Sequence, residues 1–438
     1  RTEEVFRFEN RAEMRNGRLC WNLDRLLENI IDGMKKCGAL GKIPSVAGID
    51  TWAVDFVLLD KNNRLLGEAV SYRDARTLGM DELVETIIPQ EELYRRTGIQ
   101  KQQFNTIYQL MSIKRRQPEL LEEADSLLML PDYFNFRLTG IKTQEYTNAT
   151  STALVNARDF SWDFYIINKL GLPAGLFGPL SNPGTRVGSL SPAIAQEAGF
   201  NCTVMLPCTH DTGSAFLAVP GDSRTEVFLS SGTWSLIGVE TEEPVINQKS
   251  LEANFTNEGG YGFRFRFLKN IMGLWIIQSI KRELHPSCSY DDLVNQAKNS
   301  TDYKAIINVN DPDFFAPSSM IDTVKKICIK EGNRPPGTTG EIVQCVYASL
   351  AASYAEAITQ IQYIMERAYK KIHVVGGGSK DSYLNTLIAK AAGIPVLAGP
   401  VEGSAVGNLM AQMIATGEFA SLEAAREIAG KSFEIRSY

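Results

Sequence analysis

The chain has 438 residues, of which 44% are hydrophobic and 22% are charged, and its 45 basic and 51 acidic residues give a net charge of −6. This length exceeds the usual size of one hydrophobic core, so we expect two domains. The composition is that of a globular protein, and the acidic balance argues against a nucleic-acid-binding or anionic-membrane-binding surface.

The predicted elements alternate between strands and helices, which is typical of α/β domains. Apolar runs predict strands at residues 5–8, 46–49, 56–59, 204–207, 227–229, 236–239 and 372–375. Periodic patterns predict helices at residues 83–97, 102–121, 121–139, 338–369 and 382–392. Residues 311–340 are expected to form a loop-rich surface segment. A polar stretch with Pro and Gly at 218–224 is the candidate junction, which predicts domains at residues 1–220 and 221–438.

The cysteines and histidines indicate a reducing compartment and no zinc site. The 7 cysteines include no CxxC pair, and the 3 histidines (His210, His285 and His373) lack metal-ligand spacing. No apolar run reaches membrane-spanning length, and the first residues show no signal-like pattern. We therefore expect a cytoplasmic protein.

The segment Thr209–Ser214 is the main candidate for chemistry, because it places Asp211 among small polar residues after an apolar run. Such a carboxylate could accept a proton from a substrate hydroxyl. The alternative is that Asp211 caps a helix, a position that Asp often occupies. His210 alone indicates neither catalysis nor binding.

Two further turns offer backbone N–H groups to an anion. Ser230–Thr233 follows a strand, and Gly376–Gly378 lies between a strand and a helix, where a nucleotide could approach the backbone. The first could equally be an ordinary hairpin turn. Neither matches the Rossmann or P-loop pattern. A base with two such turns suggests phosphoryl transfer from a nucleotide to an alcohol.

Two polar stretches remain. Tyr72–Arg76 places two cations around one carboxylate and is interpreted as a solvated salt-bridge cluster. Asn254–Gly260, followed by Arg266 and Asn270, is rich in the donors and acceptors that recognise polyols. A helix that carries Gln278 is expected to begin near Gly273.

Taken together, these motifs resemble the FGGY carbohydrate kinases over nearly the whole chain. The resemblance rests on the blocks Gly48–Phe56, Tyr72–Arg76, Leu130–Tyr133, His210–Thr212, Ser230–Leu236, Thr256–Gly260, Leu268–Trp275 and Val374–Ser379. It implies an α/β fold of two ribonuclease-H-like domains, as in actin and hexokinase, with a catalytic cleft between a sugar-binding N-terminal domain and a nucleotide-binding C-terminal domain. The first and the sixth block are similar to the branch that phosphorylates L-rhamnulose at its C1 hydroxyl with ATP.

The resemblance also implies roles for individual residues, with Asp211 as the proton acceptor. The sugar would be bound by Trp52, Ala53, Asp55, His210, Asp211 and Thr212. The nucleotide would be bound by Thr233, Asn270, Gln278, Gly376, Gly377 and Gly378. Mg²⁺ would arrive on the ATP phosphates, with Asp211 as a contact through water and no direct protein ligand assigned. Relatives tend to carry Gly where Ala53 stands, so we expect a slightly narrower sugar pocket.

One family feature is not found. Members begin with a strand and a phosphate-gripping loop of the type Asp-x-Gly-x-Ser-x-x-Arg, and these 438 residues hold no such pattern. We therefore expect that a segment upstream is missing from the sequence or that the chain is a truncated form. Its partners would be a ketose and ATP, with no nucleic acid or membrane, in a monomer or homodimer.

Three alternatives stay open at this point. The chain could be another ketose or polyol kinase of the same family, such as a fuculokinase or a xylulokinase. It could be a sugar-binding regulator without catalysis, for which the absent loop is the only support. An actin-like assembly ATPase is the third, and nothing in residues 256–260 suggests it.

Overall fold

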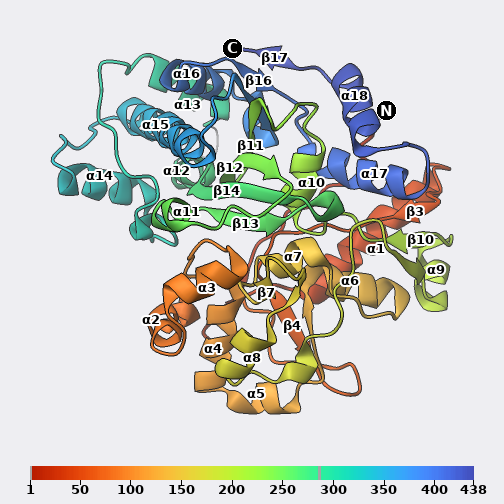
Figure 1. Cartoon of the computed structure of the whole chain (residues 1–438). Helices are drawn as coiled ribbons and strands as arrows, with labels where there is room; N and C mark the ends of the chain where they lie inside the picture. Colours follow the sequence, from red (N-terminus) through yellow and green to blue (C-terminus); the bar gives the residue numbers. More distant parts are fainter. Residues whose placement is uncertain (1, 285–287) are drawn as a thin grey trace. The chain divides into compact units, whose positions relative to one another are not determined.

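The computed structural model describes residues 2–284 and 288–438, and the chain falls into two compact units (Figure 1). The first comprises Arg1–Leu217, Thr241–Phe267 and Ser404–Ala425, and the second comprises Ala218–Glu240, Leu268–Gly403 and Arg426–Tyr438. The domain boundary predicted after residue 220 stays a prediction. His285 lies outside the described residues.

The first unit contains a three-stranded sheet, and two turns with candidate site residues, at positions 50–55 and 209–214, follow its strands. Strand β10 (Thr203–Met205) lies in its centre, parallel to β3 (Val46–Ala47) and antiparallel to β9 (Arg186–Ser189). Residues 50–55 follow β3, and residues 209–214 follow β10. Because β3 and β10 run in parallel, their C-terminal ends lie at the same edge of the sheet, and the two turns meet there.

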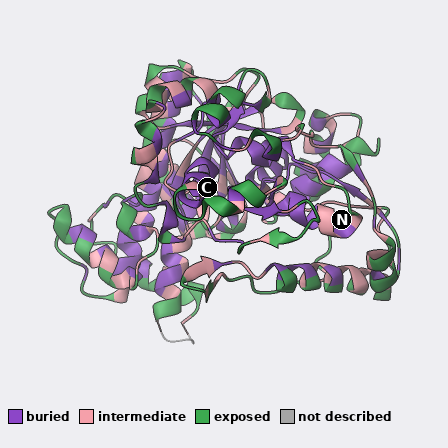
Figure 2. Cartoon of the chain, turned by 90° about the horizontal axis from the view of Figure 1, so that it is seen from below, coloured by how far each residue is buried: buried purple, intermediate pink, exposed green. Residues whose placement is uncertain are grey.

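A second sheet of the first unit is antiparallel throughout. Strand β4 (Phe56–Leu59) lies between β5 (Leu65–Leu66) and β6 (Ser126–Met129). All four residues of β4 are buried, so both faces of the strand are covered. Phe56 and Leu58 pack into one apolar cluster, and Val57 and Leu59 into another. Figure 2 shows buried residues in purple along the strands and on the inner sides of helices.

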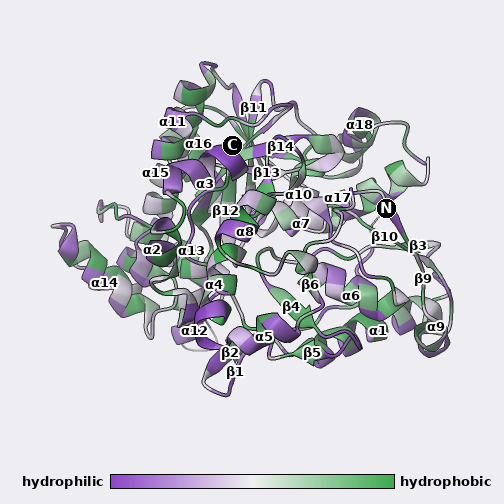
Figure 3. Ribbon diagram, turned by 60° about the horizontal axis from the view of Figure 1, so that its bottom comes forward, coloured by the Kyte–Doolittle hydropathy of each residue, from purple (hydrophilic) through white to green (hydrophobic). Residues whose placement is uncertain are grey.

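Helices cover these sheets. Those of the first unit are α1 (Leu23–Ala39), α2 (Met80–Glu85), α3 (Gln90–Thr97), α4 (Thr106–Arg116), α5 (Pro118–Glu123), α6 (Leu130–Thr139), α7 (Tyr146–Thr150), α8 (Phe164–Lys169), α9 (Pro192–Ala198), α10 (Asp211–Leu217) and α11 (Gln248–Glu252). Helix α1 illustrates the pattern, since it carries both green hydrophobic and purple hydrophilic residues in Figure 3. It buries Leu23, Leu26, Leu27 and Ile31.

Short hairpins and two later helices complete this part of the chain. Strands β1 (Glu13–Arg15) and β2 (Arg18–Cys20) pair with each other, as do β7 (Val155–Asn156) and β8 (Ser161–Trp162). Strand β13 (Thr256–Gly259) also belongs to the first unit. Helices α17 (Gly403–Ala415) and α18 (Leu422–Ser432) each have residues in both units.

The second unit contains a mixed sheet with the strand order β14-β12-β11-β15-β16-β17, in which β14 begins in the first unit. These strands are β11 (Glu226–Ser231), β12 (Trp234–Thr241), β14 (Phe265–Met272), β15 (Lys371–Val375), β16 (Val396–Ala398) and β17 (Arg436–Ser437). The helices of this unit are α12 (Trp275–Glu283), α13 (Tyr290–Lys298), α14 (Met320–Lys330), α15 (Thr339–Met365) and α16 (Ser382–Ala392). Strands β11, β15 and β16 are parallel neighbours, and α15 packs against both α13 and α16 (Figure 1).

Several sequence-based predictions are confirmed. The strands at 46–49, 56–59, 204–207, 227–229, 236–239 and 372–375 are present with shifts of a few residues. Gly140 ends α6 with φ of 79°, and Thr338 caps α15 by accepting a hydrogen bond from the Glu341 amide. The side chain of Glu341 pairs with Arg334 instead of completing a capping box.

Other predictions are wrong. Residues 83–97 form two helices, because Pro89 lies immediately before α3, and residues 102–121 break at Gln117, before Pro118. Residues 121–139 contain strand β6, whose short apolar run cannot be told from a helix by periodicity alone. Residues 311–340 contain helix α14, and residues 5–8 are not in a strand.

Within residues 2–284 and 288–438, no helix has both the length and the apolar character that crossing a bilayer requires.

Candidate active site

Asp211 is the first residue of helix α10 and is tied to the turn that follows β3. The Thr51 amide donates to the Thr209 carbonyl at 3.0 Å, and the Asp211 amide donates to the Thr51 carbonyl at 2.9 Å. Thr51 and His210 thus form a parallel bridge that extends the β3–β10 pairing beyond the strands. The chain reaches Asp211 in extended pairing, so the interpretation of Asp211 as a mere helix cap is not needed to explain its position.

The buried carboxylate of Glu145 binds the chain segment that immediately precedes Asp211. It accepts hydrogen bonds from the Thr209 amide at 3.2 Å and the Thr209 hydroxyl at 2.6 Å. It also accepts from the amide and hydroxyl of Thr147 and from the Asn148 amide. Five donors to one buried carboxylate hold the residues before Asp211 rigidly.

His210 is held by a buried arginine. The Arg266 Nη2 atom lies 3.1 Å from His210 Nδ1, and because Arg only donates, Nδ1 must accept. The ring proton therefore sits on Nε2, which lies 3.6 Å from a carboxylate oxygen of Asp211. Burial, with Arg266 nearby, holds the pKa of His210 well below its usual range, so the ring is neutral at physiological pH. His210 can donate one hydrogen bond from Nε2.

Arg266 also joins this histidine to strand β13. Its Nε donates to the Gly259 carbonyl at 3.0 Å, and its Nη1 lies 3.1 Å from a carboxylate oxygen of Glu258. The arginine side chain is 1% exposed and that of Glu258 is 6% exposed. Successive contacts thus connect the Glu258 carboxylate to the Arg266 guanidinium, the guanidinium to the neutral His210 ring, and that ring to Asp211.

Two carboxylates at this edge, Asp211 and Asp50, have raised pKa values. Burial raises the pKa of Asp211 to about 6, although 45% of its side chain is accessible to solvent. Burial raises the pKa of Asp50 to about 7, and the charge of Asp211 adds to this rise. Asn408 Nδ2 donates to Asp50 at 2.7 Å and opposes it. Asp211 is accessible and has a raised pKa, two properties expected of a general base.

The segment 52–55 is pinned by its last residue. The indole N–H groups of Trp52 and Trp21 donate to one carboxylate oxygen of Asp55 at 2.9 and 2.6 Å, and the two indole rings lie 4.3 Å apart. Val54 has φ of 67°, which is unusual for a β-branched residue. Thr106 donates to the Val54 carbonyl at 2.7 Å and helps to hold this conformation. Asp55 is 1% exposed, so its buried carboxylate holds this turn through the two indole hydrogen bonds and is not itself accessible to a ligand.

In the second unit, the turn at residues 230–233 anchors helix α12. The Leu274 amide donates to the Gly232 carbonyl at 2.9 Å, and the Trp275 amide donates to the Thr233 carbonyl at 3.2 Å. A Cβ at Gly273 would lie 2.6 Å from the Ser235 hydroxyl, so only glycine permits this approach. Helix α12, which carries Gln278, therefore starts directly on the turn that holds Thr233.

The triple glycine lies beside the same turn. Strand β15 pairs in parallel with β11, with Val375 opposite Ser230. Gly376 has φ of 86°, and a Cβ there would lie 2.9 Å from the Ser231 carbonyl oxygen. A Cβ at Gly378 would lie 2.0 Å from the Ser231 hydroxyl. A Cβ at Gly377 would meet nothing within 4 Å.

The predicted site residues thus gather in two sets, each within one unit. The first set is Trp52, Ala53, Asp55, His210, Asp211 and Thr212, and the second is Thr233, Gln278, Gly376, Gly377 and Gly378, with Asn270 on strand β14 of the same unit. Sequence reasoning did not assign Asp50, Glu145, Glu258 or Arg266. Glu258 and Arg266 lay in the stretch interpreted as polyol-binding, whereas nothing in the sequence singled out Glu145.

Comparison with known proteins gives full-length matches. Sequence models of the N-terminal and C-terminal domains of the FGGY family of carbohydrate kinases match residues 6–218 and 227–416. A rhamnulokinase of Halalkalibacterium halodurans is 48% identical and covers 99% of this chain and 93% of its own length. A rhamnulokinase of Oceanobacillus iheyensis is 47% identical and covers 100% and 92%, respectively.

Solved structures of sugar and polyol kinases share the fold. A ligand-bound xylulose kinase of Lactobacillus acidophilus has a TM-score of 0.79 at 14% identity, over 98% of this chain and 87% of that one. A Plasmodium falciparum glycerol kinase with ADP has a TM-score of 0.74 at 14% identity, over 98% and 88%. The α/β fold predicted from the sequence is therefore confirmed.

Proposed function

We propose, from the premise that this chain belongs to the FGGY family of carbohydrate kinases, that it transfers the γ-phosphoryl group of ATP to the C1 hydroxyl of L-rhamnulose. Support for the sugar comes from two rhamnulokinases that are 48% and 47% identical to this chain over nearly its full length. The observation that carries the chemistry is an accessible Asp211 with a raised pKa, held at the joined ends of two parallel strands.

In this proposal Asp211 takes the proton of the C1 hydroxyl as its oxygen attacks the γ-phosphorus. A new carbon-oxygen-phosphorus linkage forms, the bond from the γ-phosphorus to the β–γ bridging oxygen breaks, and ADP leaves. A positioned base of this kind contributes about 10²–10⁴-fold to the rate. Only an ionised Asp211 can act, which sets the pH dependence of the reaction.

The remaining sugar contacts follow from hydrogen-bond chemistry. His210 offers its Nε2 proton to a sugar oxygen, because Arg266 occupies Nδ1. Trp52, Ala53 and Thr212 provide the surrounding wall. Asp55 acts through Trp52, since its carboxylate is buried under the two indoles.

We assign nucleotide binding to the second unit. The turns around Thr233 and Gly376–Gly378 lie at the ends of the paired parallel strands β11 and β15, and Gly377 has open space beside it that a nucleotide could occupy. Asn270 and Gln278 are proposed to contact the nucleotide from the strand and helix that flank the first turn.

Mg²⁺ fits the donors on the sugar side. Among the described residues there is no cluster of three or more His, Cys, Asp or Glu that could hold a metal by itself. Mg²⁺ is normally bound by one or two carboxylates together with substrate phosphates and water. We assign Asp211 as the carboxylate that would contact such an ion through water, with Asp50 as the second carboxylate nearby. The ion would offset charge on the phosphates.

We further propose that the protein acts in the cytoplasm, where ATP is available and its free cysteines stay reduced.

A panel of ketoses tests this proposal. We expect the highest kcat/KM for L-rhamnulose, and a phosphomonoester at C1 by ³¹P NMR. A preference for L-fuculose or D-xylulose would instead support the related kinases. Sugar binding by calorimetry with no ATP turnover for any ketose would favour a non-catalytic regulator.

A further inference from the structure

A pocket rich in arginine lies in the first unit, lined by residues other than those assigned to the sugar. Its cavity volume is about 610 Å³. The charged residues in its lining are Arg15, Arg18, Arg76, Arg116 and Glu68. The protein as a whole carries a net charge of −6, so this pocket concentrates positive charge against the overall balance.

Arg76 forms the buried end of this pocket. The residue is 7% exposed, its Nη2 donates to Gln109 and to the Val70 carbonyl, and its Nε has no hydrogen-bond partner among the described residues. Burial lowers its pKa to about 10, which still leaves it charged at neutral pH. A buried charged donor without a partner is costly, unless a ligand completes its hydrogen bonding.

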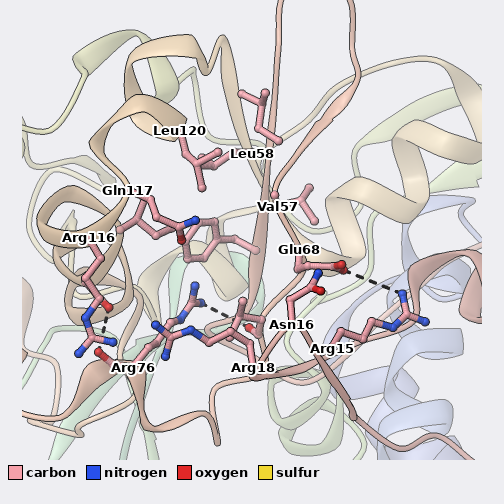
Figure 4. Close-up of a pocket in the computed structure, with 16 residues that line it drawn as sticks. Arg15, Asn16, Arg18, Val57, Leu58, Glu68, Arg76, Arg116, Gln117 and Leu120 are labelled. Atoms are coloured by element: carbon pink, nitrogen blue, oxygen red, sulfur yellow. Dashed lines mark hydrogen bonds and ion pairs between the residues drawn. The ribbon is translucent and has the colours of Figure 1, made fainter.

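Arg116 and Arg18 bring two more guanidinium groups to the same side. Figure 4 shows them gathered near Arg76, whereas Arg15 turns towards Glu68. Arg116 ends helix α4 and pairs with no carboxylate in the described part of the chain. Arg18 pairs with Asp74 at 3.2 Å and still presents its remaining donors.

The other lining residues are of two kinds. Apolar core residues include Phe56, Val57, Leu58, Val70, Ile113 and Leu120, and polar residues are Asn16, Ser112 and Gln117. Guanidinium and amide donors in one cavity suit a small anion. The planar guanidinium fork binds phosphate oxygens in pairs.

We propose that this pocket binds a small phosphate-bearing anion, with the phosphate held by Arg76, Arg116 and Arg18. A polycarboxylate shares part of this chemistry and is distinguished below. The inference does not depend on the proposed sugar or on turnover.

Hydrogen bonds connect this pocket to the segment assigned to the sugar. Gln109 accepts from Arg76 and donates to the Asp55 carboxylate at 3.3 Å and to the Val54 carbonyl at 3.1 Å. Asp55 in turn accepts from Trp52. An anion on Arg76 would change the charge beside this path, so we expect it to alter Trp52 fluorescence.

The test is calorimetric titration of the full chain with inorganic pyrophosphate, with the nucleotide site first saturated by a non-hydrolysable ATP analogue. We expect 1:1 binding that saturates below about 10 mM. Arg116→Ala should weaken it about fivefold or more, because it removes one charge-assisted contact. Arg115→Ala is the matched control, since Arg115 is the exposed neighbour on the same helix and does not line the pocket. Arg18→Ala is a second test variant. It is preferred to a change at the buried Arg76, because the Arg18 side chain is partly exposed.

Each outcome decides the proposal. Saturable binding that Arg116→Ala and Arg18→Ala weaken, and Arg115→Ala leaves within about twofold, supports it. No saturable heat, or equal losses in Arg115→Ala and Arg116→Ala, overturns it. Citrate is titrated in parallel, and binding of citrate without pyrophosphate would overturn the phosphate assignment. A failed kinase assay combined with intact pyrophosphate binding would count against the proposed function and leave this inference standing.

Discussion

The Asp211 amide donates a 2.9 Å hydrogen bond to the carbonyl oxygen of Thr51, the residue that follows Asp50. This bond joins two turns that lie about 160 positions apart in the chain and brings two carboxylates close enough for the charge of one to raise the pKa of the other.

The first prediction concerns pH. Asp211 has a raised pKa of about 6, so the base becomes protonated, and inactive, at a higher pH than an ordinary Asp would. We expect kcat/KM for the sugar to fall about tenfold per pH unit below this value. Asp50→Asn should leave that acid limb in place, because Asp50, whose pKa is raised to about 7, is already largely protonated where Asp211 titrates. A profile that stays flat to about pH 4.5 would contradict the assignment.

The second prediction concerns Arg266. Replacing it by Met should lower the free energy of unfolding by about 3–5 kcal/mol, because Glu258 would lose its buried ion pair. The double variant with Glu258→Leu should recover part of this loss. Denaturant unfolding measures both. Arg224→Met serves as control, since its pair with Asp222 is exposed and should matter little. Additive effects of the Arg266 and Glu258 changes would show that the two do not interact.

The third prediction separates the two tryptophans that share Asp55. Trp52→Phe and Trp21→Phe each remove one hydrogen bond to the same carboxylate, so their effects on stability should be similar, at about 1–3 kcal/mol. Only Trp52 is proposed to contact the sugar. We therefore expect the KM for the ketose to rise severalfold in Trp52→Phe alone. Equal KM values in the two variants would remove Trp52 from the sugar site.

The fourth prediction uses the triple glycine as its own control. Gly378→Ala and Gly376→Ala should raise the KM for ATP and lower stability, because each methyl group would collide with Ser231. Gly377→Ala should leave stability unchanged, since its methyl group would meet open space. A Gly376→Ala variant with unaltered stability and ATP KM would contradict this reading of the turn.

Much of the fold could be predicted from the sequence, because the strands around the two polar turns are short apolar runs bounded by turn residues. Strand β6 was missed for a physical reason, since its run of three apolar residues, Leu127 to Met129, fits a helix as well as a buried strand. Helix α14 was missed because the Pro- and Gly-rich residues around it suggested a loop.

The candidate site was predictable only where function needs an unusual local pattern. Asp211 and the glycines stand out among small residues. Glu145 and Asp50 do not, because their roles depend on partners far along the chain, Thr209 and Asn408. The resemblance to a family supplied roles that residue patterns alone left open.

The central claim, that Asp211 takes the proton from the C1 hydroxyl, is tested most directly by Asp211→Asn. ADP release with L-rhamnulose should fall by at least about 100-fold, while sugar binding, followed by tryptophan fluorescence, persists. A variant that binds the sugar normally and keeps a tenth or more of the wild-type rate would contradict it.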